Sequence, residues 1–413
     1  MDKYVLFGAG YYGMMAIEYI GKDKVEYFVD NDLNKDGKTL WDIPVYLFKN
    51  RVTEIKANNY VVVISVKPES QDTIKHQLSK NGIRNTIVIG ELLQNIVREK
   101  ENQNIDFEDI YGRAIMWIQS SSVKNKGIIN NTRQPLPYPE VTGYFIPTLL
   151  RFGHRELAIE YAKWLCSIQK EDGSWWDTYD KEPYIFDTAQ ILKGLIAIRD
   201  LLEVDGNIIS GCDWILSSMN PDGGVPAINE EVWGDGGTLS ELIHLYTLSP
   251  IKEAGEIFGK HEYINAVKKS LDYYLSNYRD KILDFHLLSH FYAYIVEALV
   301  DLGEMDLAKE AMVNVASIQR KDGFVPGYKD VNWVCSTGLF QFALIWYRIG
   351  EFERGEKAFT YACKLQNTTG GWYGSYPSDI GIFESPGYLP AAEISWAVKY
   401  FLDALYYRKI SRQ

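Results

Sequence analysis

The sequence predicts two domains of different class, a small α/β domain followed by a larger ring of paired helices. The chain has 413 residues, which is long enough for two domains. Two observations support this prediction. The first is a glycine-rich turn between an apolar strand and a helix near the N-terminus, and the second is a motif that recurs about every 50 residues afterwards. The predicted boundaries are residues 1–97 for the α/β domain, 98–104 for a linker and 105–408 for the ring.

The α/β domain begins with the strand Tyr4–Phe7, a glycine turn and a helix, and a second strand ends at Asp30. This order is typical of a phosphate-binding turn, because glycines allow a tight turn and the helix N-terminus offers free N–H groups. The acidic residue after the second strand can bind a ribose hydroxyl. The predicted nucleotide-binding residues are Gly8, Gly10, Tyr11, Tyr12, Gly13 and Asp30. The domain is half the size of a dinucleotide-binding fold, which favours a nucleotide or nucleotide-sugar over NAD.

The segments Val29-Asp30-Asn31-Asp32, Gly37-Lys38 and Ile43-Pro44-Val45-Tyr46 extend this pattern. Together they resemble the Rossmann-like nucleotide-sugar-binding domains of bacterial sugar acyltransferases and polysaccharide-biosynthesis proteins. The resemblance covers roughly residues 1–95. It implies a bound nucleotide-sugar and a role in polysaccharide biosynthesis. The alternative is a domain that has lost its ligand and serves only assembly.

The recurring motif closes a helix-like segment and is followed by a glycine-containing turn. It occurs at Gln119, Gln169, Met219, Gln319 and Gln366, and a degenerate copy near Tyr278 fits the longest gap. The helix after each turn is more apolar than the one before it, and a helix that is apolar all round is buried. The first helices should therefore form an outer ring and the second helices an inner ring. Six such hairpins predict a closed (α/α)6 toroid.

Two copies of the motif match a known repeat. Gln169, Gly173 and Trp175 have the same spacing as Gln366, Gly370 and Trp372. This pattern resembles the QW repeats of terpenoid cyclases. The toroid also resembles six-hairpin glycosidases, uronyl epimerases and polysaccharide lyases, over roughly Ile105 to Leu405. These resemblances imply the fold but leave the chemistry open, because one fold hosts many reactions.

The starts of the inner helices should meet at one mouth of the toroid. Polar residues there are informative, because burying them is costly unless they are paired. The candidate catalytic residues are Glu140, Tyr144, Asp187, Glu241, His290 and Glu393. For each of them the alternative is helix capping or hydrogen bonding between repeats. His286 and His290 are four residues apart and would share a helix face, but no further ligand completes a metal site, so no metal is predicted.

Aromatic residues in the turns suit the faces of sugar rings. An arginine ahead of Glu140 can neutralise a substrate carboxylate. The candidate substrate-binding residues are Arg133, Trp175, Trp176, Trp233, His286, Trp333, Trp372 and Glu384. For each turn aromatic the alternative is packing against the neighbouring repeat.

The candidate site residues fit sugar chemistry best. Glycoside cleavage needs one protonated and one ionised carboxyl group, whereas epimerisation or elimination needs a base and a group that neutralises a carboxylate. The favoured interpretation is a carbohydrate-active protein that binds a nucleotide-sugar in its first domain and cleaves or modifies a glycan in the toroid, as a hydrolase, epimerase or lyase. One alternative is a non-catalytic glycan- or nucleotide-binding scaffold. Another is an isoprenoid-handling enzyme, although the Asp-x-Asp-Asp motif of protonating cyclases is missing from the sequence.

The composition of the chain limits which partners and which cellular location we expect. The formal net charge is −12, which argues against nucleic acid as a partner. The four cysteines have no metal-ligand spacing and fall in predicted helices, so we expect reduced thiols in a cytoplasmic protein. We expect no signal peptide, because the first residues form a strand, and no transmembrane segment, because no apolar run reaches about 18 residues. The sequence leaves the oligomeric state open.

Overall fold

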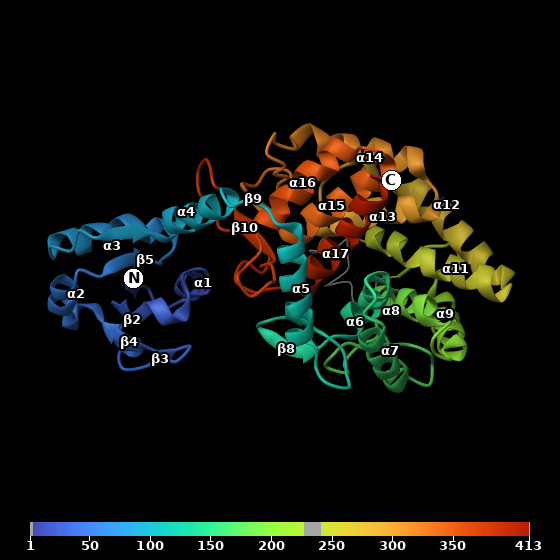
Figure 1. Cartoon of the computed structure of the whole chain (residues 1–413), viewed down its shortest axis with the longest axis horizontal. Coiled ribbons are helices and arrows are strands. Elements are labelled where there is room, and N and C mark those ends of the chain that lie inside the picture. The colour runs from blue at the N-terminus through green and yellow to red at the C-terminus, as the bar shows by residue number, and fades with distance from the viewer. Residues whose placement is uncertain (1–2, 227–240, 413) are drawn as a thin grey trace. The chain divides into compact units, whose positions relative to one another are not determined.

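The computed structural model describes residues 3–226 and 241–412, which divide into two compact units (Figure 1). The first unit comprises Met1–Gln103 and Ser375–Ala392, and the second comprises Asn104–Gly374 and Glu393–Gln413. The segment of residues 375–392 was assigned to the ring from the sequence, but it belongs to the first unit. Glu384 therefore lies in the first unit and not in the ring.

The first unit is built on a six-stranded sheet with the order β3-β4-β2-β1-β5-β6. Five strands pair in parallel, and only the short β3 is antiparallel to its neighbour β4. Two hydrophobic clusters occupy this unit, one of them formed with α1 and α4 and the other with α2 and α3. The strands are β1 (Tyr4–Phe7), β2 (Val25–Asp30), β3 (Thr39–Leu40), β4 (Ile43–Leu47), β5 (Val61–Ile64) and β6 (Thr86–Val88), and the helices are α1 (Tyr11–Ile20), α2 (Val52–Asn58), α3 (Pro68–Lys80) and α4 (Ile89–Glu101).

Helix α4 explains why the segment of residues 375–392 joins this unit. The Arg98 guanidinium donates a hydrogen bond to the Asp379 carbonyl oxygen at 2.8 Å. At Gly90, a Cβ atom would lie 2.6 Å from the Phe383 ring, so the missing side chain is what lets the two segments pack closely. Because α4 extends to Glu101, residues 98–101 are helical, whereas the sequence predicted a linker there.

The second unit alternates outer and inner helices, as predicted. The outer helices are α5 (Phe107–Ser121), α7 (Arg155–Ile168), α9 (Asp205–Ser218), α12 (His261–Leu283), α14 (Met305–Ile318) and α16 (Phe352–Lys364). The inner helices are α6 (Pro139–Arg151), α8 (Ile185–Ile198), α11 (Leu248–Phe258) with the preceding 3₁₀ turn η4 (Glu241–Thr247), α13 (Ser289–Leu302), α15 (Ser336–Ile349) and α17 (Ser395–Ile410). Each inner helix packs against the next, and α17 packs against both α15 and α6, so the inner ring closes. Short strands β7 (Ile129–Asn131) and β8 (Gln134–Pro137) form a hairpin before α6.

The recurring glutamine joins neighbouring repeats. The Gln169 amide donates to the carbonyl oxygens of Gly173, in its own turn, and of Asn207, at the start of the next outer helix. Gly173 has φ +94°, and a Cβ atom there would lie 2.2 Å from the Ser210 carbonyl oxygen. Gln366 makes the equivalent pair of bonds to Gly370 and to Ile110 of α5, which connects the last repeat to the first. The repeat therefore specifies both the turn and the contact between neighbouring hairpins, which we call the seam.

Among the helices of the described residues, none combines the length and the hydropathy needed to cross a bilayer. All four cysteines are free thiols.

Candidate active site

Two buried carboxyl groups lie at the starts of adjacent inner helices. Glu140 lies in the first turn of α6 and Asp187 in the first turn of α8, and they are 3% and 5% exposed. Burial raises the pKa of Glu140 well above its usual range, and the charge of Asp187 raises it further. Burial also raises the pKa of Asp187, to about 7. A carboxyl group with a raised pKa keeps its proton at a pH where an exposed carboxyl group is ionised.

Each carboxyl group accepts a hydrogen bond from an aromatic side chain. The Trp396 indole N–H lies 3.3 and 3.4 Å from the two oxygens of Glu140. The Tyr138 hydroxyl donates to Oδ2 of Asp187 at 3.1 Å. Trp396 comes from the first turn of α17, on the other side of α6 from Asp187 in the inner ring. The sequence did not single out these two donors as site residues.

His290 lies in a cluster of aromatic rings that includes Trp396, the donor to Glu140. Nδ1 of His290 is 2.7 Å from Oε1 of Gln341, and Nε2 is 3.4 Å from the Tyr294 hydroxyl. Because an amide oxygen only accepts, Nδ1 carries the proton and Nε2 accepts from the tyrosine. Burial lowers the pKa of His290 to about 3. The ring is therefore neutral at physiological pH and is a poor general base.

A buried ammonium group lies beside the same aromatic rings. Lys399 Nζ pairs with Asp403 at 3.0 Å and lies 3.6 Å from the centre of the Tyr400 ring and 4.7 Å from that of Tyr144. Its charge lowers the pKa of both Glu140 and His290. The sequence signal that would have identified it is a lysine one turn after Trp396, four residues before Asp403, in the buried part of an inner helix.

Four of the six predicted catalytic residues thus come together: Glu140, Tyr144, Asp187 and His290. Glu241 lies in η4 and contacts the Tyr278 hydroxyl of the outer helix α12 at 3.4 Å. Glu393 also lies apart from these four, because both of its oxygens join the turn of the last repeat to α5. It accepts from the Trp117 indole at 2.7 Å, from the Asn367 amide at 2.9 Å and from the Thr369 hydroxyl.

Most of the predicted substrate-binding aromatics are core residues. Trp175 and Trp372 are fully buried, and their indole N–H groups donate to the Leu165 and Ala362 carbonyl oxygens at the ends of outer helices. Trp333 is buried against Tyr328. Trp176 keeps partial exposure. The alternative of packing between repeats therefore holds for three of the predicted tryptophans.

The remaining candidates are dispersed. His286 is exposed, precedes α13 and bonds the Asp284 carbonyl oxygen, so it does not share a helix face with His290. Arg133 is exposed in the β7–β8 hairpin. Trp233 lies outside the described residues. Within residues 3–226 and 241–412, no cluster of three or more potential metal ligands occurs.

In the first unit, the glycine turn has the geometry that the sequence predicted. Gly8 has φ +114° with the Ser65 carbonyl oxygen 2.6 Å from where a Cβ would be, whereas the corresponding position at Gly10 is open. Asp30 accepts from the Ala9 N–H at 2.9 Å and from Lys35 at 2.8 Å. Burial disfavours its charge, but Lys35 and the backbone donors outweigh this and hold the pKa of Asp30 below its usual range. Asp30 thus fixes the turn to β2, and its predicted contact with a ribose would be additional to these bonds.

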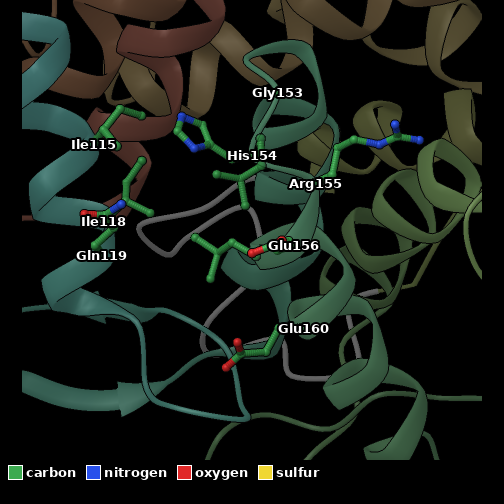
Figure 2. Close-up of a pocket in the computed structure, with 10 residues that line it drawn as sticks. Ile115, Ile118, Gln119, Gly153, His154, Arg155, Glu156 and Glu160 are labelled. Atoms are coloured by element: carbon green, nitrogen blue, oxygen red, sulfur yellow. The ribbon is translucent and has the colours of Figure 1, made fainter.

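A separate cavity of about 570 Å³ lies on the outer side of the ring, between α5 and α7 (Figure 2). Its lining includes Gln119, His154, Glu156 and Glu160. Gln119 is the motif residue of the first repeat, yet it makes no hydrogen bond to α7 among the residues described, unlike its counterparts at Gln169 and Gln366. The lining of this cavity includes none of the predicted site residues.

Comparisons with known proteins agree with the ring. The model of the squalene-hopene cyclase C-terminal domain matches residues 93–236. The chain is similar in structure to an unsaturated glucuronyl hydrolase specific for heparin, with 15% identity and a TM-score of 0.53 over 74% of this chain and 98% of that one. It is also similar to an α-mannanase from Bacteroides thetaiotaomicron (11%, 0.54, covering 76% and 99%) and to a D-mannose isomerase (10%, 0.55, covering 73% and 99%). At these identities the likeness establishes the fold, an α/α toroid.

The raised pKa of Asp187 predicts a pH-dependent stability. The unfolded carboxyl titrates near 3.8 and the folded one near 7, so the folded state becomes less stable as pH rises between these values. Replacing Asp187 by asparagine removes this cost and keeps an acceptor for Tyr138. We expect Asp187→Asn to stabilise the protein by about 2–4 kcal/mol at pH 8 and by much less at pH 4. Denaturant unfolding at both pH values measures this, and equal effects at the two would contradict it.

Proposed function

We propose that the toroid unit cleaves a glycosidic bond in an acidic glycan, with Glu140 as the general acid and Asp187 as its ionised partner. The observation that supports this is the pair of buried carboxyl groups with raised pKa values at the starts of α6 and α8. Glycosidases need one protonated and one ionised carboxyl group. The inner helices also direct the positive ends of their dipoles toward this end of the ring, which favours an anionic ligand.

The protonation state of each carboxyl group gives it a role. Glu140 keeps its proton at neutral pH and donates it to the glycosidic oxygen as the bond to the anomeric carbon breaks. While Glu140 is protonated it does not repel Asp187, so Asp187 ionises. The Asp187 carboxylate then attacks the anomeric carbon or takes a proton from the attacking water. The Tyr138 and Trp396 donors hold the two groups in place.

His290 is unsuited to serve as the base of an epimerisation or elimination. Those reactions need a base that removes a carbon-bound proton, and a histidine with a pKa of about 3 is too weak a base at neutral pH. The neutral imidazole instead offers a polar contact within the aromatic cluster.

An isoprenoid substrate is the second candidate, and the match to the cyclase domain over residues 93–236 favours it. A protonated carboxyl group near aromatic rings can also start and stabilise a carbocation. Two sets of substrates distinguish the candidates in assays of the wild-type protein. One set is unsaturated glucuronyl oligosaccharides and α-mannan oligosaccharides, and the other is squalene and shorter isoprenoids. New reducing ends support the glycan proposal. Cyclised hydrocarbon with no sugar release would replace it with the isoprenoid one.

We further propose that the first unit is a Rossmann-like domain that binds a nucleotide or nucleotide-sugar at the start of α1. Support comes from the tight Gly8 turn, the open space above Gly10 and the exposed Tyr11 beside Tyr12. A nucleotide-sugar in this unit and a glycan in the ring would place the protein in polysaccharide biosynthesis.

Gly10→Asp tests the nucleotide site. The position is open and has an extended backbone, so a side chain fits, but a carboxylate there would repel a phosphate. We expect at least a tenfold weaker affinity for UDP-sugars, measured by calorimetry with NAD and AMP in parallel, and little change for the matched control Gly10→Ala. If the wild type binds none of these ligands, the site is vestigial.

A further inference from the structure

A groove of about 460 Å³ lies at the rim of the ring, between the first two repeats. We call it the rim groove. It is formed by the end of the β7–β8 hairpin, the C-terminal end of α7 and the loop that follows the second glycine turn. The side chains used below are Lys126, Leu136, Trp164, Lys170, Trp176 and Asp177.

The rim groove is connected to the candidate active site through Tyr138. Pro137 and Pro139 both line it, and they flank Tyr138, whose hydroxyl donates to Asp187. The Thr178 hydroxyl donates to the Pro137 carbonyl oxygen at 2.9 Å, which fixes the loop to the hairpin. The charge of Asp177, in the same loop, contributes to the raised pKa of Asp187. The groove and the carboxyl pair are therefore neighbours, joined through Tyr138 and the loop that carries Asp177.

Trp176 is the residue in the groove that packing does not explain. Its neighbour Trp175 is the buried tryptophan of the repeat and fills the core, as Trp372 does in the last repeat. Trp176 is partly exposed instead, and its indole N–H is held by the Ser174 hydroxyl at 3.1 Å. Lys170 lies 5.2 Å from the centre of its ring and pairs with Asp180. The ring is thus oriented by its neighbours without being buried by them.

The lining has the chemistry of a sugar subsite. Trp164 and Trp176 are partly exposed aromatics, and Leu136 is 46% exposed. Lys126 and Asp177 provide polar groups beside them. Sugar rings present apolar faces that stack on aromatic rings and hydroxyl edges that bond to polar groups, and a mixed lining of this kind with a few convergent polar side chains is typical of small-molecule sites.

We propose that the rim groove is a glycan subsite that binds the sugars next to the bond that is cleaved, so that the substrate is an oligosaccharide longer than a disaccharide. This inference rests on the proposed function of the carboxyl pair, because that pair sets where the reacting bond lies. It adds the prediction that affinity depends on chain length and that Trp176 is responsible for the difference.

The test compares chain lengths in protein that cannot turn the ligand over. In a Glu140→Gln background, the probes are a hexasaccharide and a disaccharide, each prepared from heparin and from α-mannan, and binding is measured by calorimetry. We expect the hexasaccharide of one series to bind more tightly than its disaccharide. Adding Trp176→Ala should weaken the hexasaccharide about tenfold and leave the disaccharide unchanged. The matched control is Tyr179→Ala, which removes an aromatic that is 50% exposed in the same loop but does not line the groove.

The outcomes of this test distinguish the proposed groove subsite from the proposed hydrolysis. Three results would overturn the groove subsite, even if wild-type protein cleaves the sugars. They are an affinity that does not depend on chain length, an equal effect of Trp176→Ala on both lengths, and an effect of Tyr179→Ala as large as that of Trp176→Ala. Length-dependent binding through Trp176 without cleavage by the wild type upholds the groove and overturns the proposed hydrolysis.

Discussion

Glu140→Gln is expected to reduce glycan cleavage by about 10²–10⁴-fold, the range that a positioned general acid contributes. The glutamine keeps the shape of the side chain and an acceptor for the Trp396 indole, but it has no proton to give to the leaving oxygen. Its effect on stability should be small or favourable, because the change removes a buried acid that is repelled by Asp187. Initial rates of reducing-end release and thermal unfolding measure the two effects.

The pH profile supplies the control for this prediction. In wild-type protein the rate should fall on the acid side as Asp187 gains its proton, near its pKa of about 7, and on the alkaline side as Glu140 loses its own. In Glu140→Gln the residual rate should lose the alkaline limb only. Full activity of the variant, or loss of activity together with a large drop in melting temperature, would remove Glu140 from the role of acid.

The architecture of the ring was predictable because its repeat depends on contacts between residues that are close in the sequence. Gln169 and Gly173 are four residues apart, and the bond between them closes the turn within one repeat. The glycine also has to be a glycine, since the next outer helix lies against it. Such requirements leave a mark in the sequence at every seam where they apply. The alternation of amphipathic and apolar helices then gives the two layers.

The place of residues 375–392 was not predictable in the same way. This segment packs on α4 through contacts such as Arg98 with Asp379, which are separated by 281 residues along the chain. No periodicity or turn signal marks a contact of this range. The sequence therefore assigned the segment to the ring, as a loop of the last repeat.

The candidate site was predictable in position but not in orientation. The repeat places the starts of the inner helices, and Glu140 and Asp187 indeed lie in the first turns of adjacent inner helices. Whether a side chain near such a start points inward or toward a neighbouring turn depends on its rotation about the helix axis and on the loop before it. Trp175 and Trp176 are adjacent, yet only the second is exposed. Glu393 precedes α17 by two residues, and its loop turns it toward α5.

Glu393→Ala is expected to give the largest loss of stability among the acidic candidates. The carboxylate is 6% exposed and is the shared acceptor of the Trp117 indole, the Asn367 amide and the Thr369 hydroxyl. Trp117 belongs to the first outer helix and the other two donors to the last glycine turn, so the substitution weakens the seam that closes the ring. Removing a buried charged acceptor from its donors costs about 3–5 kcal/mol, which corresponds to a fall in melting temperature of roughly 10 °C.

The conservative change at this position distinguishes a structural carboxylate from a catalytic one. Glu393→Gln keeps one acceptor oxygen, so it should cost less than Glu393→Ala. Both variants should cleave glycan at the wild-type rate per folded molecule well below their melting temperatures, because Glu393 is bonded to the seam and not to Glu140 or Asp187. Thermal unfolding and initial rates at 20 °C give the two readouts. A Glu393→Gln variant with an unchanged melting temperature and abolished turnover would identify Glu393 as a catalytic residue. The contact between the last repeat and α5 would then depend on other bonds, such as the one from the Gln366 amide to the Ile110 carbonyl oxygen.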